Sequence, residues 1–246
     1  MKIAIVGYGK MGKAIEQVAQ KFSIKISQII KDQQDLINAT FDKNEIAIEF
    51  TEPAICMENI KLLAEKKVNI VCGTTGWYDD MALVKKTVEQ NNIGFAYSSN
   101  FSIGVNIFWR TVEQLAKLMN SVEDYDVAGH EIHHNHKKDS PSGTAIHTAE
   151  ILLKNLDRKS KVLTQTTNDR EILPEELHFT SARLGNVIGK HSVIFDSIYD
   201  TIEITHNSKS RECYAIGAIK TAKWLCNKKG FFDFQKHMEE IGNVKF

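Results

Sequence analysis

The amino terminus places the strongest constraint on the fold, because an apolar run there leads directly into closely spaced glycines. Residues 2–6 read Lys-Ile-Ala-Ile-Val, and residues 7–12 read Gly-Tyr-Gly-Lys-Met-Gly, which fits the G-x-G-x-x-G spacing. Apolar residues then recur at helical intervals from position 13 to position 22. The order strand, glycine turn, helix is typical of a domain that binds a dinucleotide.

Each glycine of this turn has its own physical role in such a domain. Gly7 permits the tight turn, Gly9 lets the backbone approach a pyrophosphate, and Gly12 allows the helix to pack closely on the strand. The first N–H groups of the helix then face the phosphates. We expect the turn to bind the pyrophosphate of NADH or NADPH through six residues: Gly7, Tyr8, Gly9, Lys10, Met11 and Gly12.

The same segment matches the spacing of a P-loop as far as Lys13. A P-loop needs Ser or Thr at the next position, where the hydroxyl binds Mg²⁺. Ala14 stands there and has no oxygen to offer, so the P-loop interpretation fails.

The residue that contacts the adenosine ribose usually lies about 20 positions beyond the glycines, at the end of the second strand. Lys31 and Asp32 occupy that place. Asp32 would accept from a ribose hydroxyl and favour NADH, whereas Lys31 would pair with a 2′-phosphate and favour NADPH. Both residues are also compatible with a solvated surface, so the sequence leaves the cofactor preference open.

Strand and helix patterns alternate through the first hundred residues. Apolar runs at 24–30, 46–50, 68–72 and 93–97 predict strands, and the periodicity at 54–66 and 79–90 predicts helices. This alternation predicts an α/β fold with a Rossmann-type, doubly wound parallel sheet, whose ligands gather at the carboxyl ends of the strands. Gly7, Thr51 and Gly73 lie at those ends.

The pattern changes after Phe101. An amphipathic stretch at 105–119, a His-rich region and apolar runs at 177–184, 192–195 and 198–205 predict a smaller α+β domain. A final helix at 212–226 carries small residues that would let it pack back on the first sheet. We expect a dinucleotide-binding domain at 1–103 with the return segment 212–246, and a substrate-binding and oligomerisation domain at 104–211.

The composition limits the classes of partner. Lys+Arg and Asp+Glu both number 31, so no net charge attracts nucleic acid or a membrane surface. No stretch approaches the roughly 20 apolar residues of a membrane span, and the amino-terminal run is too short for a signal peptide. The four cysteines form no Cys-x-x-Cys pair. We expect a cytoplasmic protein in a reducing compartment.

Residues 130–138 read His-Glu-Ile-His-His-Asn-His-Lys-Lys, a density of titratable groups that points to a ligand site. The first five residues also satisfy H-E-x-x-H, a zinc signature that requires a helix. The flanking residues favour a strand that leaves into a loop. On a strand, His130 and His134 lie too far apart to chelate one ion readily, so we expect no metal.

Pro141-Ser142-Gly143-Thr144 precedes an apolar-periodic helix at 145–153. The unpaired N–H groups of such a helix and its dipole favour an anion, and Gly143 has no side chain to keep a carboxylate away from the backbone. Thr144 adds a hydroxyl group. The alternative is that Ser142 or Thr144 only caps the helix.

Four stretches together resemble the 4-hydroxy-tetrahydrodipicolinate reductase family, also called the dihydrodipicolinate reductases. They are the glycine turn, Gly73-Thr74-Thr75-Gly76-Trp77, residues 99–106 (Ser-Asn-Phe-Ser-Ile-Gly-Val-Asn), and residues 131–137 with Pro-Ser-Gly-Thr at 141–144. Weaker similarity at Gly189-Lys190-His191 and Ser210-Arg211-Glu212 extends the match to nearly the whole chain.

The resemblance implies an NAD(P)H-dependent reductase of the diaminopimelate route of lysine biosynthesis, acting on a small dicarboxylate and assembling as a homotetramer through its second domain. It implies that His133 and Lys137 donate a proton, that His134, Gly143 and Thr144 bind substrate, and that further residues line the cofactor: Gly73, Thr74, Thr75, Ser98, Ser99, Asn100 and Phe101. Two positions depart from the family's common pattern, namely Lys31 at the ribose position and Glu49 where Asp is common.

Two other classes fit parts of the sequence. Another NAD(P)-dependent dehydrogenase, acting on an amino-acid semialdehyde, would need a reactive cysteine in the second domain, and none lies between Phe101 and Arg211. A non-catalytic dinucleotide-sensing protein would keep the glycine turn but has no need for His133 and Lys137.

Overall fold

The computed structural model describes residues 1–246, and the chain divides into two compact units. Unit 1 comprises Met1–Ile103 together with Arg211–Phe246, and unit 2 comprises Gly104–Ser210. No helix is both long enough and apolar enough to cross a membrane.

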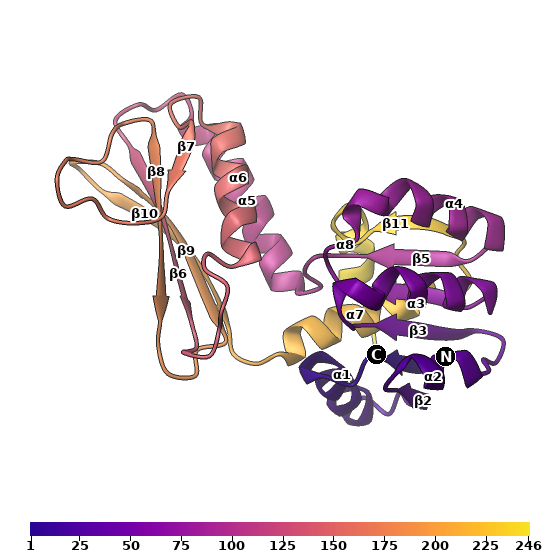
Figure 1. The fold of residues 1–246 in the computed structure, drawn as a ribbon. Helices are drawn as coiled ribbons and strands as arrows, with labels where there is room; N and C mark the ends of the chain where they lie inside the picture. The colour runs from indigo at the N-terminus through magenta and orange to yellow at the C-terminus, as the bar shows by residue number, and fades with distance from the viewer. The chain divides into compact units, whose positions relative to one another are not determined.

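Unit 1 is built on a six-stranded parallel sheet in the order β11-β5-β4-β3-β1-β2 (Figure 1). Its strands are β1 (Lys2–Val6), β2 (Lys25–Ile30), β3 (Glu45–Glu49), β4 (Asn69–Cys72), β5 (Gly94–Tyr97) and β11 (Gly230–Asp233). The chain runs outward from β1 in two directions, so the order reverses between β1 and β3. This is the Rossmann-type arrangement that the sequence predicts, with its ligand crevice at that reversal.

Helices cover both faces of this sheet. They are α1 (Lys10–Lys21), α2 (Gln33–Asn38), α3 (Pro53–Glu65), the 3₁₀ turn η1 (Tyr78–Asp80), α4 (Met81–Asn91), α7 (Glu212–Leu225) and α8 (Phe234–Gly242). Apolar residues of α1, α7 and α8 form one core cluster, and those of α3 and α4 form another. The small residues of α7 serve close packing, because a Cβ at Gly217 would lie 1.8 Å from the Phe101 carbonyl oxygen.

Unit 2 contains a five-stranded mixed sheet in the order β10-β9-β6-β8-β7. Its strands are β6 (Asp126–His133), β7 (Lys161–Leu163), β8 (Glu176–Arg183), β9 (Gly189–Asp196) and β10 (Thr201–Ser208). Two helices, α5 (Ile103–Met119) and α6 (Gly143–Asn155), pack on one face of it (Figure 1). The Trp109 indole donates to Thr148 Oγ1 at 3.1 Å and ties these helices together. The predicted α+β unit is therefore present.

Several sequence predictions need correction. The strand expected at 198–205 begins only at Thr201, because Ser197 Oγ accepts from the backbone N–H groups of Tyr199 and Asp200, each at 3.2 Å, and forms a turn. The strand expected at 177–184 ends at Arg183. Four short elements were not anticipated, namely α2, β7, β11 and α8.

Candidate active site

The three glycines of the turn have different surroundings. Gly7 has a φ of +91°, and a Cβ there would lie 2.1 Å from the Phe50 carbonyl oxygen, while a Cβ at Gly12 would lie 2.2 Å from the carbonyl oxygen of Gly7. A Cβ at Gly9 would meet nothing within 4 Å. Gly9 is the N-cap of α1 and no side chain caps that helix. The turn thus combines two packing glycines with open space beside unpaired helix N–H groups, which fits a pyrophosphate.

Two lysines lie near the expected ribose position, at the carboxyl end of β2. The ammonium groups of Lys31 and Lys13 are 5.7 Å and 5.9 Å from the centre of the Tyr8 ring. Asp32 is occupied locally, because its carboxylate accepts from the backbone N–H of Asp35 at 2.8 Å and caps α2. Lys31 and Lys13 are therefore placed to meet an anion, while one carboxylate oxygen of Asp32 caps α2.

The segment after β4 reaches the same edge of the sheet as the glycine turn. A Cβ at Gly73 would lie 2.1 Å from the Phe50 ring, so packing accounts for this glycine. Thr74 is buried, and its hydroxyl accepts from the backbone N–H of Thr51 at 2.8 Å. Thr75 is exposed. Of these residues, Thr75 alone presents its side chain to solvent.

The segment after β5 forms a tight turn at that edge. Ser98 Oγ donates to the Asn100 carbonyl at 2.8 Å and accepts from the Asn100 N–H at 3.1 Å. Phe101 is buried, with its ring 6.0 Å from Phe50 and 5.1 Å from Phe234. Ser99 is exposed. Phe101 therefore anchors the turn in the core and leaves Ser99 at the surface.

Glu49, the departure noted in the sequence, lies fully buried at the carboxyl end of β3. Its carboxylate accepts from Thr51 Oγ1, and its second oxygen lies 3.6 Å from Cys56 Sγ and 3.4 Å from Cys72 Sγ. These atoms are close enough to hold a metal ion. Burial raises the pKa of the Cys72 thiol well above its usual value, so without a cation this thiol is protonated and donates to Glu49. The three side chains then form a hydrogen-bonded cluster in the core.

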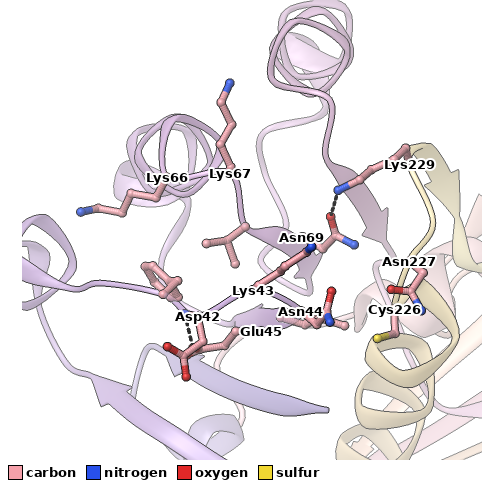
Figure 2. Close-up of a pocket in the computed structure, with 13 residues that line it drawn as sticks. Asp42, Lys43, Asn44, Glu45, Lys66, Lys67, Asn69, Cys226, Asn227 and Lys229 are labelled. Atoms are coloured by element: carbon pink, nitrogen blue, oxygen red, sulfur yellow. Dashed lines mark hydrogen bonds between the residues drawn. The ribbon is translucent and has the colours of Figure 1, made fainter.

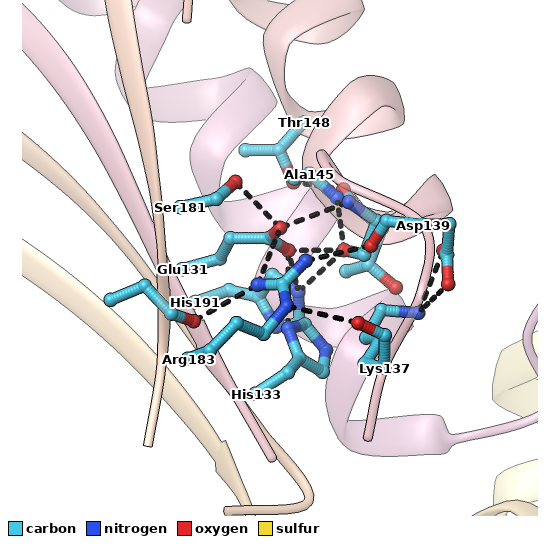
Figure 3. Close-up of polar contacts among 12 residues, drawn as sticks. Glu131, His133, Lys137, Asp139, Ala145, Thr148, Ser181, Arg183 and His191 are labelled. Atoms are coloured by element: carbon cyan, nitrogen blue, oxygen red, sulfur yellow. Dashed lines mark hydrogen bonds and ion pairs between the residues drawn. The ribbon is translucent and has the colours of Figure 1, made fainter. Parts of the chain in front are cut away.

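Glu131 is the centre of the polar network in unit 2 (Figure 3). It lies on β6 two residues before His133, so both side chains project from the same face of the strand. The side chain is fully buried. Its carboxylate accepts from the Ser142 N–H at 2.9 Å, from Ser142 Oγ and from Ser181 Oγ at 2.8 Å. Glu131 was not among the site residues predicted from the sequence.

Two histidines and an arginine face this carboxylate. His133 Nδ1 lies 3.3 Å and His191 Nε2 lies 3.4 Å from Glu131 Oε2, and Arg183 is 3.8 Å from Oε1. The His133 contact is an ion-pair distance without the geometry of a hydrogen bond. Glu131, His133 and His191 are close enough to one another to hold a metal. The two serines and Arg183 already satisfy the carboxylate, so the arrangement does not require a cation.

Burial lowers the pKa of His133 to about 4, and the positive charges of its neighbours add to that shift, whereas Glu131 opposes it. At Glu131, burial alone would raise the pKa. Hydrogen bonds from His191, Ser142 and Ser181 outweigh burial and hold the pKa of that carboxyl well below its usual range. In the free protein at pH 7, Glu131 is therefore charged and His133 is neutral.

Lys137 and its loop lie beside this cluster. Its ammonium donates to both oxygens of Asp139, at 2.8 and 2.7 Å. Arg183 holds the loop, because its guanidinium donates to the backbone carbonyls of Lys137 at 3.4 Å and Asp139 at 2.7 Å. His134 follows the end of β6, with its ring 6.3 Å from that of His136. The predicted His133 and Lys137 are thus brought to one end of β6.

The amino terminus of α6 faces the same network. Ser142 is its N-cap, because Ser142 Oγ accepts from the Ala145 N–H at 3.2 Å. A Cβ at Gly143 would meet nothing within 4 Å, so the backbone there is open to a ligand. Ser142 therefore supplies the cap that the sequence considered, and Gly143 supplies the unobstructed approach.

The H-E-x-x-H match lies on β6 and its following loop, as predicted, and not on a helix. By strand alternation His130 points away from Glu131 and His133. Its Nδ1 instead makes a 2.8 Å hydrogen bond with Thr180 Oγ1 on β8.

A pocket of about 470 Å³ lies at the opposite, amino-terminal ends of β3 and β4 (Figure 2). Three of its lysines are already used in hydrogen bonds. Lys66 donates to the carbonyls of Ile37 and Ala39, and Lys229 donates to Asn69. Lys67 donates to Asn91. These cations stabilise loops, and the pocket is remote from the glycine turn.

Residues 1–101 match the family model described as dihydrodipicolinate reductase, N-terminus, and residues 104–238 match the one described as dihydrodipicolinate reductase, C-terminus. The chain belongs to the dihydrodipicolinate reductase family. This family of oxidoreductases uses NADH or NADPH, which is the cofactor class predicted from the glycine turn.

Similar members of the family come from other named organisms. The 4-hydroxy-tetrahydrodipicolinate reductase of Christiangramia forsetii is 38% identical over 98% of this chain and 99% of that protein. The one from Archaeoglobus fulgidus is 35% identical over 97% of this chain and 100% of that protein. A dipicolinate-bound dihydrodipicolinate reductase from Paenisporosarcina sp. TG-14 shares the fold, with a TM-score of 0.70 and 19% identity over 96% of this chain and 98% of that one.

Proposed function

We propose that this reductase converts 4-hydroxy-tetrahydrodipicolinate to tetrahydrodipicolinate with NADH or NADPH, in the diaminopimelate route of lysine biosynthesis. The observation that carries the proposal is that His133 at the end of β6 and Lys137 in the following loop lie close enough for the charge of Lys137 to act on His133, in the unit that also holds the open amino terminus of α6. A chain that only senses dinucleotides has no use for that arrangement. Full-length similarity to reductases named for this reaction supports it.

The carboxyl edge of the unit 1 sheet binds the cofactor in this proposal. Gly9 and the first N–H groups of α1 hold the pyrophosphate, and Lys31 with Lys13 meets the adenosine end. The bound cofactor supplies the hydride. The remaining cofactor residues are those of the turn and of the segments after β4 and β5: Gly7, Tyr8, Lys10, Met11, Gly12, Asp32, Gly73, Thr74, Thr75, Ser98, Ser99, Asn100 and Phe101.

The dianionic substrate binds in unit 2. One carboxylate meets the backbone at Gly143 and the hydroxyl of Thr144, where the dipole of α6 favours negative charge. Lys137 adds a positive charge, and His134 contacts the substrate. The dipicolinate named with the Paenisporosarcina structure is a planar dicarboxylate of this class.

His133 and Lys137 provide the proton. Loss of the 4-hydroxyl group as water leaves an unsaturated heterocycle, and hydride addition to that ring leaves an electron-rich, enamine-like carbon that an acid must protonate. His133 is neutral in the free enzyme, because burial lowers its pKa to about 4. A dianion bound beside it favours the imidazolium and raises that pKa, so substrate binding itself charges the acid.

The kinetic test uses His133→Ala and Lys137→Ala. Each should lower kcat by roughly 10²- to 10⁴-fold, the usual effect of losing a general acid, while cofactor binding persists. Lys154→Ala is the matched control, because Lys154 is exposed in the last turn of α6 and its substitution also removes one positive charge from unit 2. Near-normal kcat in both active-site variants would contradict the assignment of His133 and Lys137 as the proton donors.

We further propose a homotetramer assembled through unit 2. Both helices cover one face of its sheet, and no helix covers the other. That open face carries mostly small, β-branched and uncharged residues, including Ala128, Ile132, Thr180, Ser192 and Ile194. A second copy of the chain would offer the same surface. Sedimentation equilibrium should give four chains, and a monomer would contradict the proposal.

We also propose that the enzyme works in the cytoplasm, because its four cysteines are free thiols, as expected in a reducing compartment. Cell fractionation followed by immunodetection tests this, and recovery of the protein outside the cytoplasmic fraction would contradict it.

A further inference from the structure

Glu131 occupies the centre of the unit 2 site, yet neither hydride transfer nor protonation uses it directly. Its two oxygens face different parts of that site. Oε1 accepts from the Ser142 N–H at 2.9 Å and from Ser181 Oγ at 2.8 Å. Oε2 accepts from Ser142 Oγ and lies 3.3 Å from His133 Nδ1. One carboxylate therefore contacts both the proposed acid and the cap of the proposed anion site.

The charge of Glu131 is unusual among the groups that face His133. Burial lowers the pKa of His133, and the charges of His191 on β9, Lys137 in the loop and Arg183 on β8 lower it further. Glu131 on β6 is the group that raises it. Without this carboxylate, burial and these three cationic neighbours would all oppose the imidazolium in the free protein.

The geometry also assigns the two ring nitrogens of His133. Nδ1 is turned toward Glu131, so Nε2 remains to exchange a proton with substrate. Gly189 on β9 makes room for that nitrogen, because a Cβ at this position would lie 3.1 Å from His133 Nε2. The ring is thus confined between a carboxylate and a glycine.

We propose that Glu131 is a positioning residue that holds His133 with Nε2 free for proton transfer, stabilises its charged form, and links it through Ser142 to the substrate-carboxylate site at α6. This inference rests on the proposed function and gives Glu131, a residue that the family resemblance did not name as a site residue, a role in that reaction. It follows that one substitution at Glu131 changes both protonation and substrate binding.

The decisive experiment is a pH titration of His133 by NMR in the protein bound to dipicolinate, with histidine labelled. Glu131→Gln keeps the shape and removes the charge, and should lower the pKa of His133 by about one pH unit or more, the usual effect of losing an opposite charge at this distance. Glu150→Gln is the matched control, because this glutamate lies on α6 with its side chain 66% exposed. Equal His133 pKa values in the two variants would overturn the inference.

Kinetics provide a second readout that a merely structural role would not move. In Glu131→Gln, the alkaline limb of the kcat profile should shift to lower pH, since the acid must be protonated, and the substrate KM should rise about tenfold or more. An unshifted limb with only a lower melting temperature would contradict the positioning role. If Glu131→Gln does not fold, Glu131→Asp can replace it, because this variant withdraws the charge from His133 by one carbon–carbon bond. Its alkaline limb of the kcat profile should shift to lower pH as well. An unshifted limb in Glu131→Asp would overturn the inference.

The outcomes separate this inference from the proposed function. If dipicolinate does not bind, or if His133→Ala keeps a normal kcat, the proposed function fails. If His133→Ala is inactive while Glu131→Gln leaves both the His133 pKa and the kcat profile unchanged, only the role of Glu131 fails.

Discussion

Replacing Gly9 by alanine separates cofactor binding from folding. Gly9 has a φ of −81°, which any residue adopts, and a Cβ there would meet nothing within 4 Å. The variant should therefore fold with an unchanged or slightly higher melting temperature. Its methyl group would stand where the backbone approaches the pyrophosphate. Losing one hydrogen bond to a charged group costs about 1.5–3 kcal/mol, so the Kd for the cofactor should rise roughly 10- to 150-fold.

Gly12→Ala is the matched control, because a Cβ there would lie 2.2 Å from the Gly7 carbonyl oxygen. Such overlap costs about 3 kcal/mol or more and should lower the melting temperature by roughly 6–12 °C. Thermal unfolding and calorimetric titration with NADPH and NADH measure the two effects. A Gly9→Ala variant that folds normally and binds both cofactors with wild-type affinity would refute the assignment of the turn to the pyrophosphate.

Three further expectations follow from the site. Lys31→Ala should weaken the binding of NADPH by about 1 kcal/mol or more and leave the binding of NADH unchanged. Equal effects on both cofactors would mean that Lys31 is a solvated surface residue without a role in cofactor preference. Gly143→Val should raise the substrate KM sharply and Thr144→Val should raise it about tenfold, with cofactor affinity nearly unchanged. A normal KM in both variants would show that the turn before α6 only caps the helix and does not bind substrate. Because burial lowers the folded-state pKa of His133 to about 4, below its ordinary value, the unfolded chain binds the extra proton between these values. The free energy of unfolding should therefore fall by about 1.4 kcal/mol per unit as pH drops from roughly 6.5 toward 4, and urea titrations of His133→Gln should show less of this loss.

The parts of the fold that the sequence predicted are those in which local pattern and tertiary role agree. The apolar runs at 2–6, 24–30, 46–50, 68–72 and 93–97 became β1 to β5 with shifts of at most one residue at either end. β1 and β4 are buried along nearly their whole length, and such strands read as continuous apolar runs. The edge strand β11 was missed because Gly230–Asp233 is only half-buried along its length. Its pairing with β5 is determined by tertiary contact rather than by local pattern.

The candidate site also has a part that the sequence predicted and a part that it did not. His133, Lys137 and Gly143 lie within one short segment, so their proximity could be read from spacing and resemblance. Glu131 was visible in that motif, but its partners Ser181 and His191 come from β8 and β9 and reach it only through the register of the sheet. The single signal available was alternation, which places Glu131 and His133 on one face of a strand.

Turnover of enzymatically generated 4-hydroxy-tetrahydrodipicolinate, followed by loss of reduced-cofactor absorbance and by mass spectrometry of the product, tests the proposed reaction itself. We expect one cofactor oxidised for each tetrahydrodipicolinate formed with the wild-type chain, and a rate lower by roughly 10²-fold or more with His133→Ala. Cofactor that binds but is not oxidised in the presence of this substrate would refute the proposed reductase activity.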